Sequence, residues 1–256
     1  MRVREWIGGL TAFSLILWGP PPLQAGIENR PLNTDDGYTL DQGAVSISVG
    51  SVFTQAHNKD KQIGINADVG FGVTDRFEIS ADFPYAFLYP KSGSNGDAFG
   101  DISIRPELNL LKESDSHPAL SIAGTVKFDN GNDDKNLGSG AVDYSLSLQA
   151  SKAFKPITLH LNGGVTFAGE PTGAKRDNVI SYNVAGEIPI GRIWTLVGEL
   201  FGQTNPDPAA ADDPLEWLVG FTYTPRKGVI LDAGMGTGLT DASPDLRVTG
   251  GVTVVF

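Results

Sequence analysis

The chain is 256 residues long, enough for one large domain or two small ones, and its composition does not change abruptly along its length. It contains no cysteine, which excludes a disulfide framework. The 30 acidic and 19 basic residues give a net charge of −11, which argues against nucleic acid as a partner. We therefore treat the chain as one acidic domain.

Residues 1–25 have the pattern of a secretory signal peptide. Two arginines precede an apolar stretch at residues 7–18, and Leu23-Gln24-Ala25 forms a small-residue cleavage site. The alternative, an N-terminal anchor helix, needs a longer apolar run than this segment offers before glycine and prolines interrupt it. We expect residues 26–43 to be a periplasmic segment and residues 44–256 to be the folded domain.

Apolar and polar residues alternate with a period of two through most of the domain, as they do in β-strands with two different faces. In residues 63–73, for example, Ile65, Val69 and Phe71 share one face while Asn66 and Asp68 share the other. The pattern predicts twelve strands, near residues 44–53, 63–73, 77–87, 100–111, 118–129, 141–151, 156–168, 179–189, 193–203, 215–224, 229–239 and 245–256.

The lengths of these strands and of their connectors favour a transmembrane β-barrel. The strands have about 9 to 13 residues, enough for a tilted strand to cross a bilayer. Short turns alternate with longer polar loops, as in barrels with periplasmic turns and external loops. The competing fold, a soluble β-sandwich, has shorter strands. We therefore predict an all-β, up-and-down antiparallel barrel of about 12 strands in the bacterial outer membrane, in contact with its lipid.

The last strand ends in an aromatic residue. Val252, Val254 and Phe256 occupy alternate positions up to the C-terminus, which looks like the assembly signal of bacterial outer-membrane barrels. The resemblance implies that the barrel assembly machinery recognises the chain through Phe256.

Three short motifs resemble a bacterial family labelled "Putative MetA-pathway of phenol degradation". They are residues 29–43 before the first strand, Gly100-Asp101-Ile102-Ser103-Ile104, and Leu137-Gly138-Ser139-Gly140. The loop before Leu137 departs from the Pro-Thr-Gly-Asp run associated with the family. The resemblance implies an outer-membrane channel or transporter-like barrel for small organic compounds, without fixing a substrate.

If the apolar faces meet lipid, the opposite faces line the lumen. These faces carry nine acids (Asp68, Glu78, Asp82, Glu107, Asp143, Glu187, Glu199, Glu216 and Asp232) against three bases (Arg105, Lys127 and Arg247). We expect a lumen or constriction cluster of Asp68, Asp82, Arg105, Glu107 and Glu199. It would either fill a narrow barrel as an ion network or select permeants by charge, favouring small cations or organic molecules.

Two further inward positions are apolar. Phe201 and Leu218 lie on adjacent predicted strands, where they would either contact an aromatic compound or pack under a loop.

Catalysis and metal binding have little support. His160, flanked by leucines, faces the lumen and is more often a polar filler than a catalytic base. Acidic pairs at Asp133-Asp134 and Asp212-Asp213 fit solvated loop charge better than a cation site. We expect no enzyme, cofactor or metal. The alternatives to a channel are a structural or adhesive surface barrel and an outer-membrane lipid-modifying enzyme.

Overall fold

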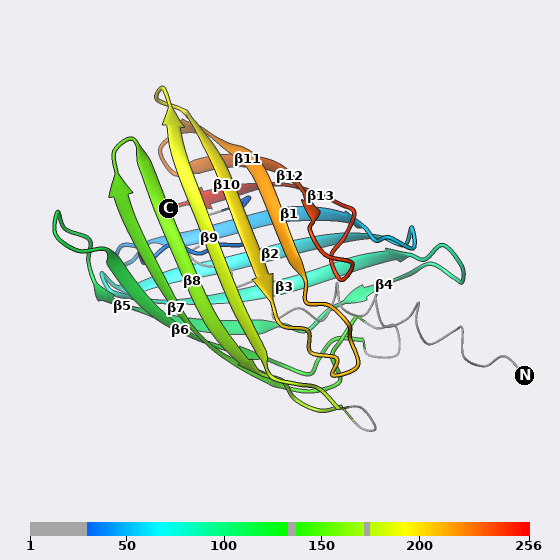
Figure 1. The fold of residues 1–256 in the computed structure, drawn as a ribbon. Helices are drawn as coiled ribbons and strands as arrows, with labels where there is room; N and C mark the ends of the chain where they lie inside the picture. Colours follow the sequence, from blue (N-terminus) through cyan, green and yellow to red (C-terminus); the bar gives the residue numbers. More distant parts are fainter. Residues whose placement is uncertain (1–29, 133–136, 172–174) are drawn as a thin grey trace, which may run out of the picture.

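The computed structural model describes residues 30–132, 137–171 and 175–256, and the regular elements in these ranges are β-strands (Figure 1). The predicted signal peptide lies outside the described residues. No helix in the described ranges is long and apolar enough to cross a membrane. The strands are β1 (Val45–Gln55), β2 (Lys61–Thr74), β3 (Phe77–Tyr89), β4 (Gly96–Phe99), β5 (Ser103–Leu111), β6 (Ala119–Lys127), β7 (Asp143–Phe154), β8 (Ile157–Phe167), β9 (Val179–Ile190), β10 (Trp194–Gln203), β11 (Leu215–Arg226), β12 (Val229–Gly238) and β13 (Leu246–Val255).

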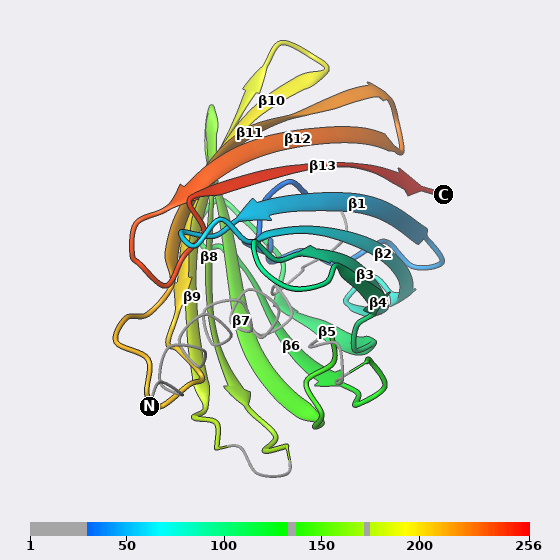
Figure 2. The same cartoon turned by 90° about the vertical axis from the view of Figure 1, so that its right-hand side faces the viewer.

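The sheet closes on itself, with neighbouring strands antiparallel (Figure 2). The first strand, β1, pairs with β2 on one side and with the last strand, β13, on the other. At this seam Ser46 lies opposite Val255, and Gln55 lies opposite Leu246. The predicted barrel is therefore confirmed.

Twelve positions make up the wall, because β4 and β5 share one of them. Strand β4 pairs with one end of β3, and β5 pairs with the other. The sequence pattern predicts one strand over 100–111, but the structure has an interruption at Asp101, between β4 and β5. The carboxylate of this residue binds backbone N–H groups of the β6–β7 loop. Apart from this break, the predicted strand ends lie within three residues of the observed ones.

The alternation separates the two faces of the wall as predicted. On β2 the outward Val69 and Phe71 are 41% and 46% exposed, whereas the inward Asp68 is 7% exposed. On β1 the inward Ser46 and Ser48 are fully buried. Large apolar side chains therefore cover the outside, where a bilayer would contact them.

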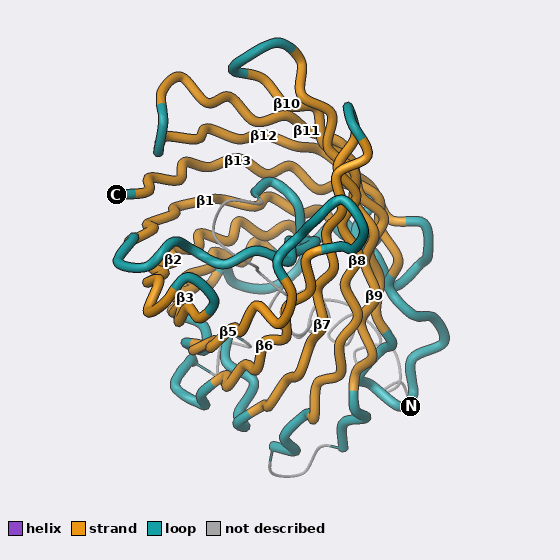
Figure 3. Tube along the Cα trace, turned by 90° about the vertical axis from the view of Figure 1, so that its left-hand side faces the viewer, coloured by secondary structure: helices purple, strands orange, loops and turns teal. Residues whose placement is uncertain are grey.

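Residues 30–40, which we call the inner segment, lie inside the barrel. Figures 2 and 3 show the start of the described chain curling within the ring of strands before it enters β1. Arg30, Leu32, Thr34 and Asp35 are buried. The sequence pattern predicts a periplasmic segment over residues 26–43, before the wall. In the structure its residues 30–40 lie inside the barrel.

Candidate functional site

The five charged residues expected in the lumen cluster all lie on the inward face of the wall. Asp68, Arg105, Glu107 and Glu199 are at most 7% exposed, and Asp82 is half-buried with one carboxylate oxygen completely covered. All five stand on strands, so the closed sheet fixes their height and direction.

Asp68 and Asp82 form the first of three separate groups among the five residues. They lie directly opposite each other on β2 and β3. The Asn66 side-chain amide donates a hydrogen bond of 3.1 Å to Asp68. The two carboxylates therefore face each other from adjacent strands on the inward side of the wall.

Arg105 and Glu107 form a second group on β5, together with a residue that strand alternation does not indicate. The Arg105 guanidinium lies 2.8 Å from Glu107 and 2.9 Å from Asp35 of the inner segment. All three side chains are almost completely buried. Alternation along strands could not indicate Asp35, because the residue lies outside every strand.

Glu199 on β10 accepts hydrogen bonds from the inner segment. Its carboxylate receives the backbone N–H of Asn33 at 2.8 Å and that of Thr34 at 2.9 Å. The Asn33 amide and the Thr34 hydroxyl add bonds of 2.7 and 2.8 Å. These donors supply the partners that a buried carboxylate needs.

Phe201 and Leu218 pack under the inner segment. Leu218 is 1% exposed and forms a small core with Leu32, Val197 and Ala185, and Phe201 packs against this core. Leu32 therefore occupies the apolar patch for which an aromatic ligand was considered.

His160 contacts a serine and an acid, the residue types of a catalytic triad. Its Nδ1 lies 2.7 Å from the Ser151 hydroxyl, and its Nε2 lies 3.8 Å from Glu187. However, the Ser151 oxygen also accepts the Gly37 N–H at 2.8 Å, and Ser151 is 1% exposed. The inner segment thus covers the hydroxyl, which a nucleophile would have to present to a substrate.

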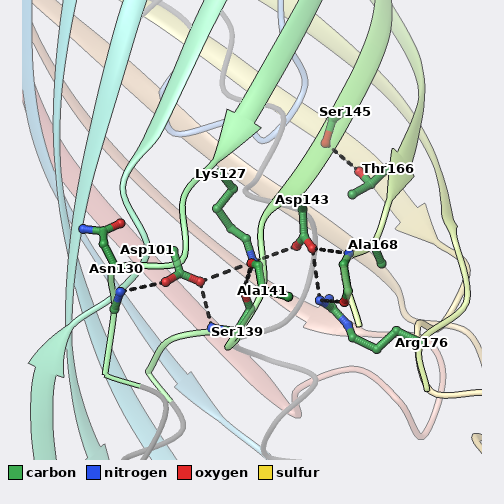
Figure 4. A network of polar contacts seen from close by, with 12 residues as sticks. Asp101, Lys127, Asn130, Ser139, Ala141, Asp143, Ser145, Thr166, Ala168 and Arg176 are labelled. Carbon is green, nitrogen blue, oxygen red and sulfur yellow. Dashed lines mark hydrogen bonds and ion pairs between the residues drawn. The ribbon is translucent and has the colours of Figure 1, made fainter. Parts of the chain in front are cut away.

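A buried network joins the loops at the end of the barrel that carries the long connectors (Figure 4). The Lys127 ammonium lies 3.3 Å from Asp101 and 2.6 Å from Asp143. Asp143 also binds Arg176, from the β8–β9 loop, at 3.2 Å. Burial lowers the pKa of Arg176, although the charge of Asp143 opposes this shift.

The described parts of the β6–β7 loop, residues 128–132 and 137–142, contact the wall next to this network. Leu137 is buried against Ala86 and Leu88 of β3. Asp101 holds the same loop by accepting the N–H groups of Gly131 at 2.8 Å and Ser139 at 2.7 Å. These contacts hold the described parts of the loop against the wall at this end.

The acidic loop pairs provide no metal site in the described ranges. Asp133 and Asp134 lie outside these ranges. Asp213 accepts the Asn205 N–H at 2.8 Å, and the Asp212 carbonyl accepts the Asn205 amide at 3.0 Å, so both belong to the internal bonding of their loop. No group of three or more potential metal ligands occurs among the described residues.

The chain is similar to several solved outer-membrane barrels. It matches the COG4313 outer membrane channel from Pseudomonas putida F1 with a TM-score of 0.70 and 16% identity, covering 86% of this chain and 98% of that one. The NanC porin matches with a TM-score of 0.57 and 12% identity, over 81% of this chain and 98% of that one. The KdgM porin matches with a TM-score of 0.54 and 11% identity, over 82% of this chain and 99% of that one. These matches confirm a barrel of the outer-membrane type.

The sequence itself identifies the family. No curated protein matches the chain. A family model described as "Putative MetA-pathway of phenol degradation" matches residues 28–256, which include every strand of the barrel. The chain therefore belongs to this family.

Proposed function

We propose that the chain forms an outer-membrane channel that passes small cations and small uncharged organic molecules. The observation that carries this proposal is the facing pair Asp68 and Asp82 on a wall with an excess of acids. Acidic groups in a pore with walls of low dielectric constant raise the local concentration of cations and exclude anions. The names of the similar structures, an outer membrane channel and two porins, agree with a passive path.

The size of the barrel supports small permeants. Barrels of about 8 strands are filled by side chains and those of about 16 strands leave a wide channel, so twelve strands fall between these cases. Here the inner segment and the β6–β7 loop occupy part of the interior. The family description suggests small aromatic compounds as one class of uncharged permeant.

Reversal potentials of the refolded protein in a planar bilayer test the charge selectivity. Replacing Asp68 and Asp82 together with asparagine should lower the preference for cations, while Asp115→Asn in an exposed short turn should leave it unchanged. Salt screens such effects over about 8 to 10 Å at physiological concentration, so low ionic strength is required. An anion-selective pore, or equal selectivity in all three proteins, would contradict the proposal. A complete lack of conductance would favour a structural or adhesive barrel.

A further inference from the structure

We propose that the inner segment, residues 30–40, forms a ring inside the barrel and sets the narrowest part of the permeation path. This inference rests on the proposed channel function. It differs from that proposal in assigning the constriction to the segment before β1 and not to the acidic side chains of the wall.

The contacts of the inner segment follow the wall in strand order. Read backwards from residue 40 to residue 30, its contacts move step by step around the barrel from β3 to β13. The Leu40 N–H binds Glu78 on β3 at 2.7 Å. The Gly37 carbonyl accepts Asn109 of β5 at 2.6 Å and Ser121 of β6 at 2.9 Å, and the Gly37 N–H binds Ser151 of β7.

The second half of the segment continues the circuit. The Asp35 N–H binds Asn162 of β8 at 2.5 Å, and Asn183 of β9 donates to the Asn33 carbonyl at 3.1 Å. Glu199 of β10 and Leu218 of β11 follow. Arg30 then lies 3.4 Å from Asp232 on β12 and donates to Thr249 on β13 at 3.2 Å. A chain that contacts successive strands around a cylinder lies along the wall as a ring.

Charge fixes the ring at three places. Arg30 faces Asp232, Asp35 faces Arg105, and backbone N–H groups face Glu199. All these charged groups are buried, and a buried charge that loses its partner is strongly unfavourable. These contacts hold the segment against the wall, where it occupies cross-section that a solute would otherwise use.

The wall has glycines where the ring approaches it most closely. A Cβ atom at Gly251 would lie 2.8 Å from Arg30 Nε, and one at Gly50 would overlap the Arg30 guanidinium. At Gly220 it would lie 2.5 Å from the Ala233 carbonyl oxygen of the wall and 2.9 Å from the Pro31 ring. By contrast, a Cβ at the inward Gly64 would meet only a backbone oxygen 3.9 Å away. Gly50 lies beneath the ring and Gly64 lies away from it, so the two glycines can serve as test and control positions for a substitution.

Single-channel conductance of refolded protein measures the constriction directly. Deleting residues 30–40 should raise the conductance by roughly twofold or more, because twelve strands without an internal segment enclose a wider path. Gly50→Ala should displace Arg30 and change the conductance, while Gly64→Ala should leave it at the wild-type level. Heat-modifiability of the electrophoretic band verifies that each barrel is folded.

A labelling experiment covers the case in which the deletion prevents folding. The chain has no cysteine, so Asn33→Cys introduces a single thiol at a partly buried position of the ring. Modification of Asn33→Cys with a charged thiosulfonate should reduce the conductance. Modification of Gly64→Cys should reduce it much less. Equal effects at the two positions would overturn the inference.

The outcomes separate the inference from the proposed function. If the wild type conducts and the deletion has the same conductance, the ring is not the constriction, although the channel function stands. If only the deletion conducts, the inner segment governs the lumen and the wild type is not an open channel. If neither folded protein conducts, both proposals are wrong.

Discussion

Arg105 on β5 binds Asp35 of the inner segment at a distance of 2.9 Å, inside the closed wall. The alternation along β5 predicts that Arg105 faces the lumen, but the acid that approaches it from the inner segment precedes all the strands in sequence. This ion pair therefore attaches the N-terminal part of the described chain to the middle of the barrel.

Removing the Arg105 cation should destabilise the barrel. Arg105→Gln leaves Asp35 and Glu107 buried without their shared partner, which should cost about 3 to 5 kcal/mol in the free energy of unfolding. Urea titration of folding into lipid vesicles measures this quantity. The control Arg76→Gln, in an exposed turn, should change it by about 0.5 kcal/mol or less. A similar stability for both variants would show that the ion pair does not matter.

A buried lysine and an exposed lysine can be compared to test how much the network at the mouth contributes to stability. Lys127→Met leaves Asp101 and Asp143 without their common cation and should cost about 3 to 5 kcal/mol. Lys59→Met removes a pair with Asp245 in which the lysine is 57% exposed, and should cost about 1 kcal/mol or less. The same titration, combined with limited proteolysis of the β6–β7 loop, checks both values. Greater damage from Lys59→Met would contradict the assignment.

Labelling of introduced cysteines on intact cells should establish the orientation. Cysteines at Ser94 and Asp212, in long connectors, should react with an impermeant thiol reagent. A cysteine at Ser114 in a short turn should stay unlabelled until the outer membrane is permeabilised. All three positions are exposed, so a difference in labelling reports the side of the membrane. Strong labelling at Ser114 on intact cells would invert the topology.

Deleting Phe256 should leave export intact and reduce insertion into the membrane. Its side chain is 73% exposed, and its backbone N–H donates to the Val45 carbonyl at 2.9 Å. The backbone thus joins the seam and the ring stays exposed, as recognition by the assembly machinery would require. The yield of heat-modifiable barrel measures insertion, and Phe256→Tyr, which keeps an aromatic ring, should restore it. An unchanged yield after the deletion would remove the role expected for Phe256.

Lysine on the lipid-facing side of β13 should cost more towards mid-strand. At mid-bilayer a lysine costs about 2 to 4 kcal/mol and less near the interface. Val254 pairs with Val229, the first residue of β12, so it lies near the edge, whereas Val252 pairs with Leu231 further in. Val252→Lys should therefore destabilise folding more than Val254→Lys. The opposite order would place the bilayer differently on the wall.

The wall could be predicted from the sequence because the physics of each strand is local. Inward and outward residues alternate whichever neighbours the strand finds, so Asp68 and Glu199 could be placed in the lumen from parity alone. The break at Asp101 could not, since it depends on N–H groups supplied by Gly131 and Ser139 about thirty residues later. Single-strand patterns contain no information about such a partner.

The inner segment could not be predicted for a related reason. Residues 30–40 have no regular period, and their place depends on groups distributed over ten strands. Parity predicts an excess of acids on the inner face and two inward apolar residues, Phe201 and Leu218. It does not predict that Leu32 and Arg30 cover part of that face.

The seam between β1 and β13 also determines the order in which the molecule can be completed. Ser46 and Val255 pair across nearly the whole length of the chain, so this ladder forms only when the last strand is available. The inner segment leads directly into β1, yet it binds strands up to β13. Its binding site therefore does not exist while the first half of the chain is being made. The first described residues to be synthesised are among the last to reach their final positions.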